Sequence, residues 1–394
     1  MSISRMSAIL CAVLSAALTF GPVRAAEPTH GVTDTEIIIG TMTDLSGVTA
    51  VQGTNNANAI RMAFDEVNEK GGIHGRKIRY IIEDNEYLVP KSVQAMNKLI
   101  NRDNIFFALA NGGTPHNEAV MPAMFEKHVP NIFPLTCARS MYEPLNRYKF
   151  GQFSSYYDQM RAGVKYFVEK KGKTKIGSMY EDTDFGRDVH AGAVAQIAAM
   201  GLKLAAEATN KPTDSDFSGS VAKMRDAGCD LICMGTIVKD TTLILQTAHK
   251  LGWNPDFVGQ FASYSTAVAE VPGGPAEGFY SMSPGLYAYP DDPRPAVQEV
   301  SARYRKRYGI DFNYLGEAGW TAATFMIDVL QKNGRDLTLD SLIATLETMK
   351  DWRDVFGSPP LTITPTNHHA SNQSFLSVVK SARWVPVEAE PMSY

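Results

Sequence analysis

Helix and strand patterns alternate along this chain from Glu36 onward, and no other feature of the sequence limits the possible folds as much. The predicted strands of the first half are Glu36–Met42, Lys77–Glu83, Ile105–Ala110 and Asn131–Phe133, and its helices are Asn55–Lys70, Lys91–Arg102 and Pro115–Lys127. Those of the second half are the strands Lys175–Tyr180, Lys203–Ala208, Asp230–Gly235 and Asp256–Gln260, and the helices Asp158–Lys170, Phe185–Met200, Phe217–Ala227 and Thr241–Leu251. This alternation predicts an α/β fold with parallel sheets. A chain of 394 residues exceeds one ordinary domain, so we expect two lobes.

The run Ala63–Asp84, AFDEVNEKGGIHGRKIRYIIED, is the most characteristic unit of this pattern. Its helix stops at Gly71 and Gly72, because glycine accepts the left-handed backbone of a helix end. A β-branched strand that closes on an acid follows. The helix, the GGIxG turn and this strand resemble the periplasmic solute-binding proteins of ABC transporters, of the Leu/Ile/Val-binding type. The resemblance covers nearly all of the mature chain.

The resemblance implies a type I periplasmic binding fold, in which two doubly wound parallel-sheet lobes are joined by a hinge of several strands. It implies that residues 35–152 and 279–350 form the first lobe, and that residues 153–278 and 356–390 form the second. The chain would then cross between the lobes three times. Several crossovers at the base of two lobes make a hinge that can close over a ligand.

The N-terminus reads as a signal peptide, residues 1–26. Arg5 supplies the charged region, Ala8–Phe20 is apolar, and Val23–Ala26 offers a small-residue cleavage site. The apolar run is shorter than the roughly 20 residues that a spanning helix needs. We therefore expect a periplasmic protein with no membrane span after cleavage. An uncleaved anchor is the alternative.

Charge and motifs exclude several functional classes. Loss of residues 1–26 removes Arg5 and Arg24 and no acid, so basic residues fall from 38 to 36 against 42 acidic ones and the net charge moves from −4 to −6. No basic tail or patch suits nucleic acid. Phosphate-loop, dinucleotide, zinc-protease and serine-hydrolase motifs are missing, so we expect no enzyme and no cofactor. His368 and His369 lie in a Pro/Asn-rich loop with no nearby third ligand, so we interpret them as structural and expect no metal.

The mature chain has three cysteines, Cys137, Cys229 and Cys233. An odd number leaves at least one thiol unpaired within a single chain. A disulfide between Cys229 and Cys233 is possible, but the pattern favours small buried apolar residues.

The loops that follow the strands are the candidate ligand-binding segments, because ligands of open α/β sheets lie beyond the carboxyl ends of the strands. In Asn111–Pro115, two glycines permit close backbone approach. Thr114 suits an N-cap and Pro115 a first helical turn. The start of this helix is a natural carboxylate site. Ordinary capping, with Thr114 bonded only to its own helix, is the alternative.

The resemblance extends this site to further loops. It implies that Thr114 and Cys137 occupy hydroxyl positions, that Leu135 offers its backbone, and that Gln52 stands where the family often has an aromatic residue. In the second lobe Phe185 takes a ring position and Ile237 replaces a tyrosine. The predicted ligand-binding residues are Gln52, Gly113, Thr114, Leu135, Thr136, Cys137, Phe185, Ile237 and Phe261.

Phe261 is the main departure from the family pattern. The family's amino-acid binders carry an acid at this position, which pairs with the α-ammonium of the ligand. An ammonium left unpaired in a closed cleft would cost several kcal/mol. We therefore expect an apolar or aromatic acid without an α-amine. The alternative is a branched-chain or related amino acid held by a displaced acid, namely Glu181, Asp182 or Asp240.

These observations predict a monomeric, periplasmic substrate-binding component of an ABC importer. It would capture a small carboxylate-bearing solute between its lobes and deliver it to a membrane permease. A periplasmic ligand sensor on the same fold, or a secreted hydrolase, is the alternative.

Overall fold

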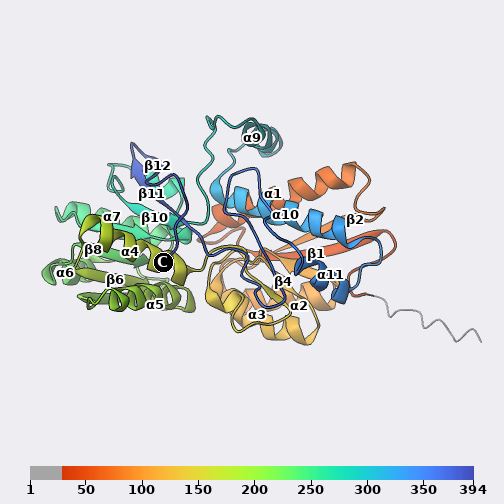
Figure 1. The fold of residues 1–394 in the computed structure, drawn as a ribbon, viewed down its shortest axis with the longest axis horizontal. Helices are drawn as coiled ribbons and strands as arrows, with labels where there is room; N and C mark the ends of the chain where they lie inside the picture. Colours follow the sequence, from red (N-terminus) through yellow and green to blue (C-terminus); the bar gives the residue numbers. More distant parts are fainter. Residues whose placement is uncertain (1–28) are drawn as a thin grey trace, which may run out of the picture.

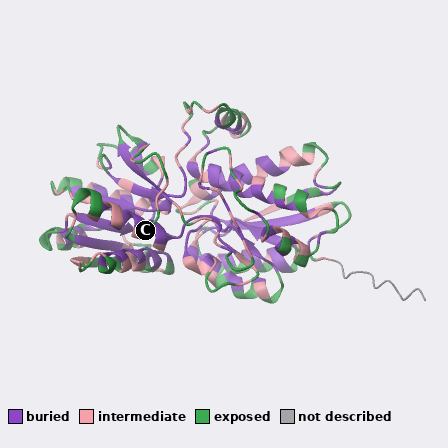
Figure 2. Ribbon diagram, viewed as in Figure 1, coloured by how far each residue is buried: buried purple, intermediate pink, exposed green. Residues whose placement is uncertain are grey.

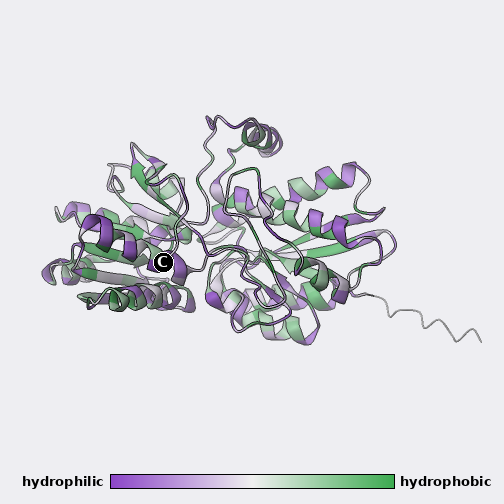
Figure 3. Cartoon of the chain, in the orientation of Figure 1, coloured by the Kyte–Doolittle hydropathy of each residue, from purple (hydrophilic) through white to green (hydrophobic). Residues whose placement is uncertain are grey.

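The computed structural model describes residues 29–394, which build two α/β units side by side, each around its own sheet (Figure 1). The predicted signal peptide, residues 1–26, lies outside the described residues. Within residues 29–394, no helix combines the length and the apolar character needed to cross a membrane. The central strands of both sheets, such as β1 and β8, are buried, whereas the edge strands β2, β7 and β12 are partly exposed (Figures 2 and 3).

The first sheet has five parallel strands in the order β2-β1-β3-β4-β5. The strands are β1 (Glu36–Thr43), β2 (Lys77–Asp84), β3 (Phe107–Leu109), β4 (Asn131–Ile132) and β5 (Lys149–Phe150). The helices packed around this sheet are α1 (Ala50–Glu69), α2 (Val89–Asn101), α3 (Thr114–Glu126), α9 (Pro295–Tyr308), α10 (Tyr314–Asn333) and α11 (Leu339–Leu346).

Both faces of this sheet are covered, as expected for parallel strands. Successive side chains of β1 point to opposite faces. Ile37 and Ile39 join the apolar core beneath α1 and α10, whereas Ile38 and Met42 join the core beneath α2 and α3. This double burial explains why β1 carries three consecutive isoleucines, Ile37–Ile39, instead of an alternation of apolar and polar residues.

The second sheet has seven strands in the order β12-β11-β10-β9-β8-β6-β7. Its strands are β6 (Ile176–Glu181), β7 (Ala206–Asn210), β8 (Leu231–Gly235), β9 (Asp256–Gly259), β10 (Tyr280–Ser283), β11 (Phe375–Lys380) and β12 (Arg383–Pro386). The helices of this unit are α4 (Tyr156–Lys171), α5 (Asp184–Ala199), α6 (Ser218–Asp226), α7 (Val238–Lys250) and the short α8 (Thr266–Ala269). The pairs β10–β11 and β11–β12 are antiparallel, so this sheet is parallel except at one edge.

The sheet pairing and the apolar cores differ from the lobe boundaries predicted from the sequence at two places, near residues 279 and 356. Strand β10 was expected in the first lobe, yet Tyr280 pairs with Val258 of β9 in the second sheet. Residue 356 was expected in the second lobe, yet Phe356 belongs to the core of the first. An apolar run identifies a strand or a core segment but not its neighbours in space.

Helix α1 begins at Ala50, five residues before the predicted start at Asn55. Among the described residues, Cys137, Cys229 and Cys233 are all buried free thiols. The possible Cys229–Cys233 disulfide is therefore not formed.

Candidate ligand-binding site

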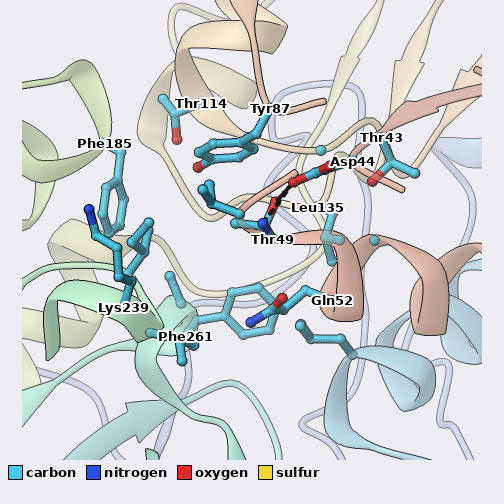
Figure 4. Close-up of a pocket in the computed structure, with 18 of the residues that line it drawn as sticks. Thr43, Asp44, Thr49, Gln52, Tyr87, Thr114, Leu135, Phe185, Lys239 and Phe261 are labelled. Carbon is cyan, nitrogen blue, oxygen red and sulfur yellow. Dashed lines mark hydrogen bonds between the residues drawn. The ribbon is translucent and has the colours of Figure 1, made fainter. Parts of the chain in front are cut away.

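A cavity of about 80 Å³ lies where the strand ends of the two sheets face each other (Figure 4). Its lining comprises Thr43, Asp44, Val48, Thr49, Gln52, Gly53, Tyr87, Gly112, Gly113, Thr114, Leu135, Tyr156, Phe185, Ile237, Val238, Lys239, Phe261, Ala262 and Leu315. A buried water needs roughly 10–15 Å³, so the cavity has the size of a small organic molecule. Tyr87 and Thr114 lie on one side of it, and Gln52 and Phe261 on the other.

The loop after β1 is held in shape by one carboxylate, that of Asp44. Its Oδ1 accepts hydrogen bonds from the amides of Ser46 (3.1 Å) and Gly47 (2.6 Å). Its Oδ2 accepts from the Thr49 amide (2.7 Å) and hydroxyl (2.8 Å). A side chain at Gly53 would meet the backbone oxygen of Asp44, so only glycine lets α1 approach this loop. The conformation of the loop is thus fixed by hydrogen bonds between its own residues.

Three buried asparagines tie the neighbouring strand ends together. Asn111 accepts a hydrogen bond from the Met42 amide (2.9 Å) and donates to Asn131 (3.1 Å). Asn131 in turn donates to Asn117 on α3 (2.9 Å). Buried polar networks that satisfy their members rigidify a site. The network sets the relative positions of the ends of β1, β3 and β4, and with them the cavity wall.

The start of α3 differs in detail from the sequence expectation. The N-cap is Gly113, whose φ of 83° favours glycine, and Thr114 is the first helical residue. The prediction of Thr114 as N-cap is therefore wrong. Its hydroxyl lies 2.6 Å from the Thr136 hydroxyl on the next loop, so it is not bonded to its own helix alone. In the first turn of α3, the amides of Thr114 and His116 have no acceptor within the helix, Pro115 has no amide hydrogen, and the Asn117 amide donates to Gly113 O (3.1 Å).

The second predicted loop divides into residues at the cavity and residues behind it. Leu135 lines the cavity, but its amide donates to Asn111 O (2.8 Å). Thr136 and Cys137 are buried and do not line the cavity. Burial raises the pKa of the Cys137 thiol well above its usual value. The structure therefore places Thr136 behind Thr114, and Cys137 in the core.

The second unit contributes an apolar wall. Phe185 packs edge-on against Tyr156, with ring centroids 4.9 Å apart. The Phe261 ring lies 5.2 Å from Phe153 and 5.6 Å from Tyr314. Ile237 precedes α7 and completes this wall. These packed rings offer a fixed apolar surface to a ligand.

Of the described residues that line the cavity, only Asp44 and Lys239 carry a full charge. Both oxygens of Asp44 already accept two hydrogen bonds each, as described above. The Lys239 ammonium donates to Pro212 O (2.6 Å) and Asp214 O (3.0 Å). It also lies 3.1 Å from Asp240 Oδ1. No carboxylate of this lining is therefore free to pair with a cationic group.

Two further acids, Glu181 and Asp240, are buried behind this wall. Neither lines the cavity; Oε2 of Glu181 has no hydrogen-bond partner among the described residues, whereas Oδ1 of Asp240 faces the Lys239 ammonium. Burial, reinforced by Asp240, raises the pKa of Glu181 to about 7 against the opposing effects of Thr183 and Lys239. Close to neutral pH, Glu181 is thus partly protonated and a weaker counterion than an ordinary carboxylate.

A family model described as periplasmic binding protein matches residues 36–383. The chain belongs to the periplasmic binding protein family. Leu/Ile/Val-binding protein homolog 7 of Brucella abortus (strain 2308) is 25% identical over 298 residues, covering 70% of this chain and 71% of its own. Homologues named Leu/Ile/Val-binding proteins are thus among the sequence relatives of this periplasmic binding protein. The family and fold are those of solute-binding proteins.

Solved structures share the fold of this periplasmic binding protein. A branched-chain amino acid ABC transporter protein from Thermus thermophilus, with bound valine, is 18% identical with a TM-score of 0.81, covering 91% of this chain and 97% of its own. A solute-binding protein of an ABC transporter from Rhodopseudomonas palustris BisB5, in complex with 3,4-dihydroxybenzoic acid, is 20% identical with a TM-score of 0.78, covering 92% and 98%. At such identities the likeness concerns the fold.

The site of this periplasmic binding protein contains residues that the sequence reasoning did not select. Tyr87, Tyr156, Lys239 and Leu315 all line the cavity. Tyr87 follows β2, so applying the strand-end rule to that loop as well would have found it. Leu315 is the second residue of α10, far from the other lining residues in the sequence, and no sequence pattern marked it as part of the site. Seven of the predicted residues share the cavity wall: Gln52, Gly113, Thr114, Leu135, Phe185, Ile237 and Phe261.

Proposed function

We propose that this protein is the periplasmic receptor of an ABC importer for a small apolar or aromatic carboxylic acid that lacks an α-amine. The carboxylate binds at the start of α3, where the Thr114 hydroxyl and the amides of Thr114 and His116 provide donors and the helix end favours an anion. The apolar body lies against Phe185, Ile237 and Phe261. Closure of the two units encloses the acid, and a membrane permease recognises the closed form.

One observation carries the choice of ligand: the cavity wall has no carboxylate free to pair with an ammonium group. Asp44 is saturated by its own loop. Enclosing an unpaired ammonium would cost several kcal/mol, whereas an acid without an amine avoids this cost. The two solved structures of this fold described above support a carboxylate in general, since their ligands, valine and 3,4-dihydroxybenzoic acid, both carry one.

Binding of an amino acid is the second candidate, and the unpaired Oε2 atom of Glu181 favours it. A rotation of this side chain toward the cavity would supply a counterion. Its raised pKa weakens this candidate, because a protonated acid does not stabilise an ammonium.

A thermal-shift screen separates the two candidates. Benzoate and phenylacetate are expected to raise the melting temperature, whereas leucine and valine are not. A ligand at 100 times its Kd adds about 2.7 kcal/mol of stability, which a melting curve resolves. Stabilisation by leucine or valine alone would contradict the proposed ligand class while leaving the receptor role intact.

Glu181→Gln gives a second, independent test. If the ligand has no amine, the affinity for benzoate stays within about twofold of the wild-type value. If an amine is bound, affinity for the amino acid falls strongly, because its counterion is lost. Asp182→Asn is the matched control, since Asp182 is largely exposed and pairs with Arg187.

A further inference from the structure

A second cavity, of about 220 Å³, adjoins the first. Four residues line both cavities, and their side chains form the partition: Val48, Gln52, Val238 and Leu315. The second cavity lies on the side of α8 and of the start of α10, away from Thr114. A ligand whose carboxylate is held at α3 would therefore point its distal end toward the partition.

The two cavities share a continuous aromatic surface. Phe261 lines the first cavity, and its ring lies 5.6 Å from that of Tyr314, which lines the second. The Tyr314 ring lies 4.9 Å from Tyr264, and Tyr264 lies 6.1 Å from Tyr287. Aromatic surface of this kind contacts flat or extended apolar groups.

The wall of the second cavity is largely apolar, and its polar groups are uncharged. None of its described lining residues is charged, and the backbone amide of Tyr287 donates to the Tyr264 hydroxyl (3.0 Å). Ser265 and Thr266 add hydroxyls to its wall. This chemistry suits an uncharged tail that ends in an ether or hydroxyl. It does not suit a second carboxylate.

Gln52 is the one flexible polar member of the partition. Its side chain makes no hydrogen bond with any residue of the described range 29–394, so little holds it in place. The backbone beneath it is fixed, because Gly53 packs directly on Asp44. Rotation of the Gln52 side chain would join the two cavities without moving α1.

We propose that the second cavity is a subsite for the distal end of an elongated carboxylate, and that Gln52 sets the length of ligand accepted. The ligand class is an aryl carboxylate with an uncharged substituent opposite the carboxylate. This inference rests on the proposed function, because it requires the carboxylate to be held at the start of α3.

Calorimetric titration of benzoate and 4-propoxybenzoate tests the subsite. The measured quantity is the ratio of the two Kd values, which cancels general effects of a substitution on closure. Wild-type protein should bind 4-propoxybenzoate at least as tightly as benzoate. Gln52→Ala, which removes the partition, should shift the ratio about tenfold or more toward the longer acid, since each added group in an apolar pocket changes affinity by roughly 10–200-fold.

Ala267→Trp provides the opposite change. Ala267 is exposed and lines the second cavity, so an indole at this position fills the space without disturbing the core. It should shift the ratio about tenfold toward benzoate. Gln94→Ala, at an exposed glutamine of α2, is the matched control. Melting curves confirm that each variant is folded.

The outcomes separate this inference from the proposed function. If benzoate binds but the ratio is unchanged in Gln52→Ala, Gln52 does not set ligand length. If the ratio is unchanged in Ala267→Trp, the second cavity is not a subsite. If neither acid binds to any variant, the proposed carboxylate ligand itself is wrong, and the inference falls with it.

Discussion

The hydroxyl oxygen of Thr114 lies 2.6 Å from that of Thr136, and both residues are buried. This contact links the start of α3 to the loop after β4. Either hydroxyl can donate within this pair, and Thr136 Oγ1 also accepts the Ala138 amide (3.4 Å). In the proposed binding mode Thr136 donates to Thr114, so that the Thr114 proton is directed to the ligand carboxylate.

Thr114→Val tests the role of this hydroxyl. A hydrogen bond to a charged group contributes about 1.5–3 kcal/mol, so the Kd for benzoate should rise about ten- to hundredfold. Thr114→Ser keeps the hydroxyl and should retain most of the affinity. Titration calorimetry measures both. Equal affinities of the valine variant and the wild-type protein would show that the carboxylate binds elsewhere.

Phe261→Leu tests the aromatic wall. Leucine keeps most of the apolar volume of this buried site, so the fold should survive, but the ring contacts with Phe153 and Tyr314 are lost. Affinity for benzoate should fall about three- to tenfold more than affinity for an aliphatic acid such as hexanoate, because an aromatic pair contributes about 0.5–1.5 kcal/mol beyond its buried area. A parallel loss for both acids would contradict contact between Phe261 and the ligand ring.

The stability of this protein should fall as pH rises through the neutral range. Burial raises the pKa of Glu317 to about 8 in the folded state. The folded protein then holds a proton that the unfolded chain releases near its ordinary pKa of about 4.3. The stabilisation is fully present below that value and is lost as pH rises toward 8. Asp354 raises this pKa further, while Arg294 and the Ala288 amide oppose it.

Glu317→Gln should remove roughly 2–4 kcal/mol of this pH-dependent loss, because glutamine stays neutral and can still accept the Ala288 amide. Urea unfolding at pH 5.5 and pH 9 measures the difference. Glu181 contributes a smaller loss of the same sign, so the variant keeps some slope. Glu299→Gln, at an exposed carboxylate, serves as control. An unchanged slope in Glu317→Gln would exclude Glu317 as its source.

Thiol labelling tests whether the cysteines are free and buried, and whether the signal peptide has been removed. Cys137, Cys229 and Cys233 are buried, and burial raises the pKa of each thiol, so the native protein should not react with an aromatic disulfide reagent. After unfolding in denaturant, three thiols should react. A single reactive thiol would indicate the Cys229–Cys233 disulfide. Four reactive thiols would indicate that the signal peptide, which contains Cys11, is retained.

The sequence predicted the parallel cores well because their signal is local. Buried strands such as β1 read as apolar runs, and glycines such as Gly71 mark helix ends by their backbone freedom. The place of β10 could not be read in the same way. Its apolar pattern fits either sheet, and the pairing with β9 depends on contacts distant in sequence.

The residues that line the cavity were predicted only in part, again because only some of the information is local in sequence. Strand ends point to the correct loops, so Thr114 and Phe261 were found. The direction of a side chain within a loop is not periodic, and thus the sequence could not show that Cys137 turns into the core. The four hydrogen bonds that the Asp44 carboxylate accepts likewise depend on the folded turn and leave no periodic signal in the sequence.

The order of the strands has a consequence for how this protein can be divided. The second sheet is assembled from residues 176–283 and again from residues 375–386, while α10 between them packs along α1 of the first. No single cut therefore releases one intact unit, and a fragment ending near residue 340 would lack the β11–β12 edge. Proteolysis in a connecting segment should leave the pieces associated, and synthesis must be nearly finished before the second sheet is whole, although all five strands of the first lie within residues 36–150.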